Sequence, residues 1–241
     1  MRKYYNYAVM ALLMLSLLIT GGCYKDYNCI DGNGNAINET RTMSPFHEVV
    51  CNGSYEVTVL PGNAHEVVVD AESNLIHYIR TSVAGGRLYL DTENNHCINN
   101  SIPVLITVYS PFVDGLDLNG SGSIRASGLY IEYLNLNISG SGNIDVNADA
   151  LQLKARISGS GSMDINGVCG TSDLNVSGSG NIHAYGMMQD ECLATISGSG
   201  NIYATVNQIL DGKISGSGNI YYKGNPMVYQ DISGSGRIIK Q

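Results

Sequence analysis

A three-residue motif, Gly-Ser-Gly, occurs seven times in the second half of the chain, and this repeat constrains the fold more than any other feature. The copies begin at Gly120, Gly140, Gly159, Gly178, Gly198, Gly216 and Gly234. The intervals between them are 20, 19, 19, 20, 18 and 18 residues. Such a nearly constant period indicates one small structural unit stacked repeatedly on itself.

Apolar residues accompany every copy of the motif at fixed offsets. Two positions after the last glycine lie Ile124, Ile144, Met163, Ile182, Ile202, Ile220 and Ile238. Two positions before the first glycine lie Leu118, Ile138, Ile157, Val176, Ile196, Ile214 and Ile232. A third column, two residues beyond the first, contains Ala126, Val146, Ile165, Ala184, Ala204, Tyr222 and Lys240. This alternation with a period of two predicts strands on both sides of each glycine turn.

A strand–turn–strand unit with one apolar face must bury that face against its neighbours, and stacking does so. We therefore predict an all-β protein, a parallel solenoid of about seven Gly-Ser-Gly coils. The units lack the aliphatic residue every six positions of hexapeptide solenoids. They also lack the Gly-Gly-x-Gly-x-Asp pattern of calcium-binding solenoids.

Residues 44–115 contain runs typical of strands but no Gly-Ser-Gly. Examples are Ser54–Leu60 and Ile102–Tyr109. We interpret this block as an N-terminal β region that caps the open first coil of the solenoid at 116–241, so that 44–241 form one continuous domain. Within it, Leu75, Ile79 and Val83 have helical spacing, which predicts a short helix over 74–84.

The N-terminus resembles a bacterial lipoprotein signal peptide over residues 1–22. Arg2 and Lys3 precede an apolar run from Ala8 to Thr20, which is too short to span a bilayer. The run ends at Gly21-Gly22-Cys23, and the resemblance implies that Cys23 receives the lipid and becomes the first mature residue. The alternative is an ordinary signal peptide, with Cys23 an incidental thiol.

Residues 23–43 comprise the lipidated cysteine and a predicted flexible tether, because the segment around Asp31–Asn35 is rich in turn residues. The localisation that follows is the cell envelope, with the protein lipid-anchored in the outer membrane on its periplasmic or cell-surface face. The formal net charge of -8 argues against nucleic acid as a partner, because phosphate binding needs a basic surface.

The chain as a whole resembles the family described as putative auto-transporter adhesin, head GIN domain, a domain of unknown function found in Bacteroidetes lipoproteins. The resemblance rests on Tyr55–Val59, Gly86–Leu90, Pro111–Gly122 and the Gly-Ser-Gly-Asn-Ile repeats, and it covers about residues 44–241. It implies a right-handed parallel β-helix-like fold. It implies no activity, because the family has no assigned catalytic residues.

The sequence contains no recognisable catalytic, metal or cofactor motif. The histidines lack paired metal-ligand spacing, and the motif serines do not form a Gly-x-Ser-x-Gly elbow. Asp145 and Asp164 occupy equivalent positions in adjacent coils, where they either share a metal ion or belong to a solvent-facing column. Together with Lys154 and Arg156 they are the candidates for a polysaccharide-cleaving site. We expect no enzymatic activity and no cofactor.

Five cysteines remain after Cys23, and an odd number leaves at least one thiol unpaired. Their pairing is left open among Cys29, Cys51, Cys97, Cys169 and Cys192. Cys169 and Cys192 either pair or pack as small buried hydrophobes.

The chain has sixteen tyrosines, two phenylalanines and no tryptophan. Tyr203, Tyr221 and Tyr222 are predicted to form an aromatic stripe, which is either a binding surface or cross-strand packing.

Three functions are compatible with these features. The favoured one is a non-enzymatic, lipid-anchored adhesin or binding module whose solenoid surface meets a glycan or a cell-surface protein. The others are a β-helix enzyme acting on polysaccharide and a structural or envelope-stress module without a ligand. The sequence leaves the oligomeric state open.

Overall fold

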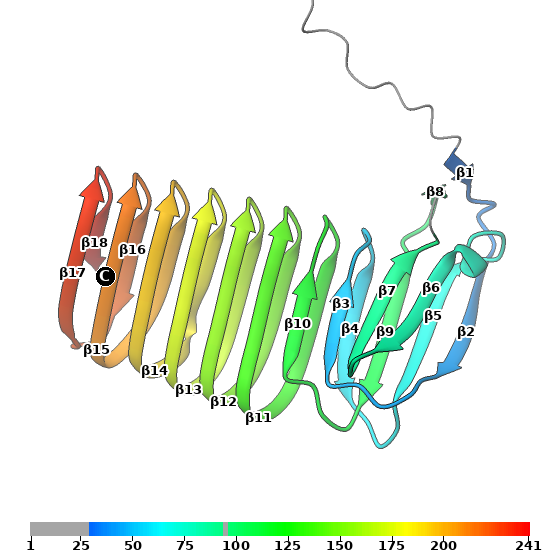
Figure 1. Cartoon of the computed structure of the whole chain (residues 1–241), viewed down its shortest axis with the longest axis horizontal. Helices are drawn as coiled ribbons and strands as arrows, with labels where there is room; N and C mark the ends of the chain where they lie inside the picture. The colour runs from blue at the N-terminus through cyan, green and yellow to red at the C-terminus, as the bar shows by residue number, and fades with distance from the viewer. Residues whose placement is uncertain (1–28, 94–95) are drawn as a thin grey trace, which may run out of the picture.

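The computed structural model describes residues 29–93 and 96–241, which form an all-β protein with a β-solenoid as its main body (Figure 1). The predicted signal peptide and Cys23 lie outside the described residues. Within those residues, no helix has the length and apolar character needed to cross a membrane.

Five long strands form the regular part of the solenoid, and each runs through a whole coil between two Gly-Ser-Gly turns. They are β11 (Ser123–Gly140), β12 (Asn143–Gly159), β13 (Ser162–Gly178), β14 (Asn181–Gly198) and β15 (Asn201–Gly216). All neighbours pair in parallel, and the predicted columns align: Ile144 pairs with Met163, and Met163 with Ile182. The solenoid of about seven coils is thus confirmed.

The Gly-Ser-Gly turn requires both of its glycines. Gly178 has φ 129°, and a Cβ there would lie 2.4 Å from the carbonyl oxygen of Gly159 in the preceding coil. A Cβ on Gly180 would lie 2.5 Å from the carbonyl oxygen of Gly161. The close approach lets the Gly159 carbonyl accept hydrogen bonds from the N–H groups of both Ser179 and Gly180. Glycine is the residue that permits this conformation and contact.

Each long strand bends once more at a corner opposite the Gly-Ser-Gly turn, so that every coil has two walls. We call the residues before this corner the first wall and those after it the second wall. In β12, Ile144 and Val146 of the first wall and Ala155 and Ile157 of the second are buried in the core between them. The corner lacks a repeated glycine, and the strand register shifts at or shortly before it in several coils.

The last coil departs from this pattern. It consists of β16 (Asn219–Lys223), β17 (Met227–Gly234) and β18 (Arg237–Lys240). Ile232 is exposed although its equivalents in earlier coils are buried, because no further coil covers it.

The N-terminal region first adds parallel strands to the stack of coils and then closes the end of the stack. Its β3 (Glu48–Cys51) and β4 (Glu56–Pro61) pair in parallel with β10 (Gly115–Leu118) and β11. Cys51 aligns with Leu118 and Val57 with Ile124, so Gly53-Ser54-Tyr55 takes the place of a Gly-Ser-Gly turn. Beyond them, β7 (Arg87–Thr92) and β9 (Leu105–Ser110) add one more parallel layer.

Antiparallel strands close this end of the stack. They are β2 (Ala36–Thr42), β5 (Glu66–Glu72) and β6 (Ile79–Ala84). The predicted helix over 74–84 is wrong: only the 3-10 turn Ile76–Tyr78 is helical, and β6 follows it directly. Gly85 and Gly86, both with positive φ, join β6 and β7 in a hairpin, so strand pairing overrides the helical spacing.

The predicted flexible tether over 23–43 is wrong for its described part, residues 29–43. Residues 29–31 form β1 (Cys29–Asp31), which pairs with β8 (Cys97–Asn99), and a disulfide joins Cys29 to Cys97. β2 then pairs with β5 along its whole length. Backbone pairing orders this polar segment, although it has almost no apolar face of its own.

Candidate binding surface

One outward-facing column on the first wall contains ionisable and aromatic side chains in neighbouring coils. Strand register aligns it coil by coil, through Arg125, Asp145, Asp164, His183, Tyr203, Tyr221 and Ile239. Since parallel strands lie about 4.8 Å apart, neighbouring side chains of this column are within reach of one another.

The aromatic part of this column is a continuous ring stack. The centroids of His183 and Tyr203 lie 4.7 Å apart with an interplanar angle of 11°, and those of Tyr203 and Tyr221 lie 5.0 Å apart at 9°. Tyr185 meets Tyr203 edge-on, and the Lys223 ammonium lies 4.4 Å above the Tyr185 ring. Both faces of the Tyr203 ring are therefore covered, and the stack presents ring edges and hydroxyls to solvent.

Tyr222 does not belong to this stripe. It pairs with Ala204 in the inward-facing column and packs against the core, with its side chain partly buried. The predicted trio therefore reduces to Tyr203 and Tyr221, joined by His183, which we did not predict. Alternation places Tyr222 inside, because neighbouring residues of a strand face opposite sides.

Asparagine side chains two positions before the aromatic column form hydrogen bonds from one coil to the next along the first wall. The Asn181 Oδ1 accepts hydrogen bonds from the Asn201 N–H at 3.1 Å and from Asn201 Nδ2 at 3.0 Å. Asn219 donates to Asn201 in the same way, and the N–H of Arg237 donates to Asn219. This ladder fixes the spacing between the coils that present the rings.

The residues considered for polysaccharide cleavage do not converge. Asp145 and Asp164 lie side by side on the first wall. Lys154 and Arg156 follow the corner and lie on the second wall, where Arg156 contacts Asp173 at 3.4 Å. The apolar core separates the two pairs, so they cannot act on one substrate bond.

One group of metal-ligand side chains appears among the described residues, in the N-terminal region. His47, Glu48 and Asp114 place one potential ligand atom each within 4.8 Å of one another. Their charges are already engaged: His47 Nδ1 lies 2.9 Å from Asp114, and Arg87 forms ion pairs with Glu48 and Asp117. Asp114 lies 67 residues from His47, so no local spacing could have revealed the group.

The free thiols are buried and unreactive in character. Cys51, Cys169 and Cys192 are all unpaired. Burial raises the pKa of Cys169 to about 11 and that of Cys192 to about 12, so both remain protonated at neutral pH. They pack as small core residues, which was one of the two interpretations left open by the sequence.

The model of a protein family matches residues 45–226, and its description is putative auto-transporter adhesin, head GIN domain. The chain belongs to this family. None of the curated protein sequences matches it.

Solved structures of similar proteins agree with the head GIN domain fold. A crystal structure described as a putative lipid binding protein from Parabacteroides distasonis is 29% identical, with a TM-score of 0.75, and the alignment covers 88% of this chain and 99% of that one. A putative adhesin from Bacteroides fragilis is 21% identical with a TM-score of 0.82, covering 88% and 100% of the two chains. A putative adhesin from P. distasonis is 22% identical with a TM-score of 0.71, covering 89% and 100%.

Proposed function

We propose that this protein is a non-enzymatic binding module of the cell envelope, anchored through a lipid on Cys23, that presents its solenoid surface to a partner. The observation that carries the proposal is the placement of the reactive groups. The carboxylates of Asp145 and Asp164 and the basic groups of Lys154 and Arg156 lie on opposite walls, and what the coils share is an extended, rigid surface. The family description as an adhesin supports this function.

The geometry of the ring stack favours a protein over a glycan as the partner. Sugars bind aromatic side chains mainly through the open faces of the rings. The faces of Tyr203 are covered by His183 and Tyr221, so this surface offers hydroxyls and ring edges instead.

The ordered N-terminus supports a position close to the membrane. Cys29 is fixed to Cys97 by the disulfide and lies only six residues after Cys23. Six residues span at most about 20 Å, so an acylated Cys23 would hold the domain at about that distance from the bilayer. β1 would then be the membrane-proximal corner of the protein.

The test is a binding screen with residues 24–241, a fragment that contains every described strand. The fragment is incubated with arrays of glycans and of purified cell-surface proteins, and reducing-sugar release from polysaccharides is measured in parallel. We expect saturable binding to a protein and no release of sugar. Catalytic sugar release would support the enzyme instead, and the absence of any ligand would support a structural module.

A further inference from the structure

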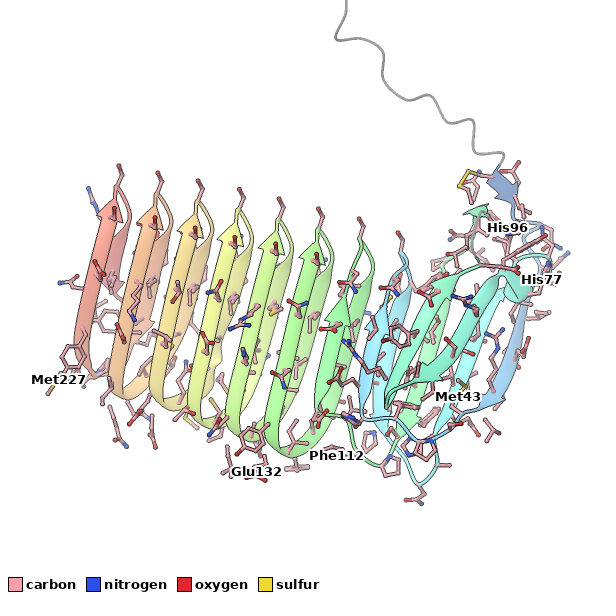
Figure 2. All side chains as sticks on the ribbon, viewed as in Figure 1. Met43, His77, His96, Phe112, Glu132 and Met227 are labelled. Carbon is pink, nitrogen blue, oxygen red and sulfur yellow. A yellow bond between two sulfur atoms is a disulfide. The ribbon has the colours of Figure 1, made fainter. Side chains whose placement is uncertain are left out.

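The corner opposite the Gly-Ser-Gly turns carries exposed apolar side chains in one coil after another. We call it the corner ridge, and define it as residues 130–133, 149–152, 168–171, 188–191 and 207–209. Tyr130, Leu151 and Met188 are 79%, 63% and 54% exposed, and Tyr133 and Val168 are exposed beside them. Figure 2 shows that Phe112 and Met227, also exposed, lie along the same edge near the two ends of the ridge.

These side chains lie in four successive coils, and a carboxylate interrupts their row along the register. Tyr130 pairs with Asp149, Asp149 with Val168, and Val168 with Met188, each in the next coil. Five coils at about 4.8 Å per step give the ridge a length of about 20 Å, which matches an extended segment of about six residues. Exposed apolar patches of this kind mark interaction sites.

The fold itself does not require an apolar ridge. Ala150, Cys169, Gln189 and Val206 fill the interior of this corner, and they are buried. The outward side chains add nothing to that core. The opposite corner shows that polar residues serve equally well in such a position, because each Gly-Ser-Gly turn there exposes a serine.

The ridge is also acidic. It contains Glu132, Asp149, Asp190 and Glu191, and none of its residues is lysine, arginine or histidine. Among the ion pairs of the described residues, none involves these four carboxylates. Asp149 and Asp190 are instead steadied by polar groups of the next coil, the Val168 N–H and the Asn207 amide.

A shallow groove of about 490 Å³ runs beside the ridge. Tyr133, Gln152 and Thr171 form its ridge side, the partly exposed Leu193 contributes apolar surface, and the buried Leu153 lines it together with Lys154 and Asp173. The groove offers a partner a place for one apolar side chain next to the acidic strip.

We propose that the corner ridge is the docking surface for a protein segment that combines basic and apolar side chains and lies along the stack of coils. A second copy of the ridge would bring like charges together, and an anionic membrane would be repelled. Tyrosine and methionine are typical of protein interfaces, and methionine adapts its shape to a partner. The proposal rests on the proposed function, because anchoring beside β1 leaves the ridge on the opposite edge, facing away from the bilayer (Figure 1).

The experiment uses residues 24–241 and three short synthetic peptides, measured by fluorescence anisotropy. One peptide alternates lysine and leucine, one replaces the lysines with glutamate, and one replaces the leucines with serine. We expect the lysine–leucine peptide to bind tightest, with an affinity that falls as salt is added.

Paired variants identify the surface that binds. Leu151→Ser with Met188→Ser should weaken binding about tenfold or more, and Glu132→Gln with Glu191→Gln should weaken it and flatten its salt dependence. The controls are Leu105→Ser, at an exposed leucine outside the ridge, and Asp145→Asn with Asp164→Asn on the first wall. Thermal unfolding establishes that all variants fold.

Unchanged binding by both ridge variants would overturn the proposal. If the parent protein forms dimers in analytical ultracentrifugation and the ridge variants do not, the occupant is a second copy of the chain and the proposal is overturned. If the parent binds phosphatidylcholine vesicles and the ridge variants do not, the occupant is a lipid surface and the proposal is likewise overturned. A ligand from the binding screen that binds the ridge variants as well as the parent would refute the ridge while leaving the binding-module function intact. A screen without any ligand would refute the function itself.

Discussion

Single side chains in the solenoid have roles set by the direction in which they point. Ile182 is fully buried in the core, whereas its neighbour Asn181 points outward and accepts two hydrogen bonds from Asn201. Ile182→Asp places a charge without a partner among apolar side chains and should destabilise the protein by several kcal/mol. Asn181→Asp keeps the acceptor oxygen and should be mild. Thermal unfolding compares the two, and equal shifts would contradict the assigned alternation.

A buried carboxylate makes the N-terminal cap sensitive to acid. Glu72 accepts hydrogen bonds from the Ser101 hydroxyl at 2.5 Å and from the N–H groups of Gly34 and Ser101 at 2.6 and 2.9 Å. The Ser101 hydroxyl, and then these backbone groups, hold the pKa of Glu72 below its ordinary value of 4.5. Its contribution to stability is therefore complete above about pH 4.5 and is lost as the pH falls through the lower folded-state pKa.

We expect Glu72→Gln to lower the melting temperature at neutral pH, because the amide cannot accept all of these bonds. The difference from the parent should shrink as the pH falls below 4.5 and through the lowered pKa of Glu72, because the parent then loses the ionised carboxylate as well. Scanning calorimetry at a series of pH values measures the difference in melting temperature between variant and parent. Glu132→Gln, on the exposed corner, is the control. A constant difference at every pH would show that ionisation of Glu72 contributes nothing.

Among the elements, those with repeated sequence could be predicted and those held by long-range pairing could not. The coils from Gly120 onward were evident because backbone contact at the turn admits only glycine, so the motif recurs. The coil formed by β3 and β4 was missed because Tyr55 stands where the second glycine would be. β1 and β2 depend on partners far along the chain. β6 pairs with its neighbour β7 in a hairpin, and Gly85 and Gly86 were its one local signal.

The candidate site was predicted only in part, for a related reason. Column positions of Tyr203 and Tyr221 follow from counting residues after each motif, and so their proximity was predictable. The register that adds His183 to them follows from the same count. The corner ridge could not be found by counting residues from the Gly-Ser-Gly motif, because register shifts near the corner change the offset of its residues from coil to coil.

The last strand element is the one most exposed to pairing with another molecule. β18 ends the stack with Arg237 at the end of the asparagine ladder and Lys240 in a column that is buried in earlier coils. Long cationic side chains obstruct the addition of further strands. Arg237→Asn with Lys240→Val should therefore keep the fold and increase self-association. Light scattering over a range of concentrations tests this, and a variant as monodisperse as the parent would refute edge protection.

The whole molecule is a rod whose two ends and two edges differ, and the proposed lipid anchor would decide which of them faces outward. The disulfide-fixed Cys29, six residues after Cys23 in the sequence, lies at the end of the rod that carries the antiparallel cap. Acyl chains supply membrane affinity of about 0.8 kcal/mol per buried CH₂, and more than one chain is needed for stable binding. The acidic surface offers no electrostatic substitute for them.

We therefore expect Cys23→Ala to move the protein from the membrane fraction to the soluble fraction of the cell. The matched control is Cys29→Ser with Cys97→Ser, which removes the disulfide but leaves the proposed acylation site in place, and it should stay in the membrane fraction. Fractionation followed by immunoblotting measures both variants, and metabolic labelling with a fatty acid shows which of them carries lipid. Membrane retention of the Cys23→Ala protein would refute the lipid anchor, and with it the orientation that turns the corner ridge away from the bilayer.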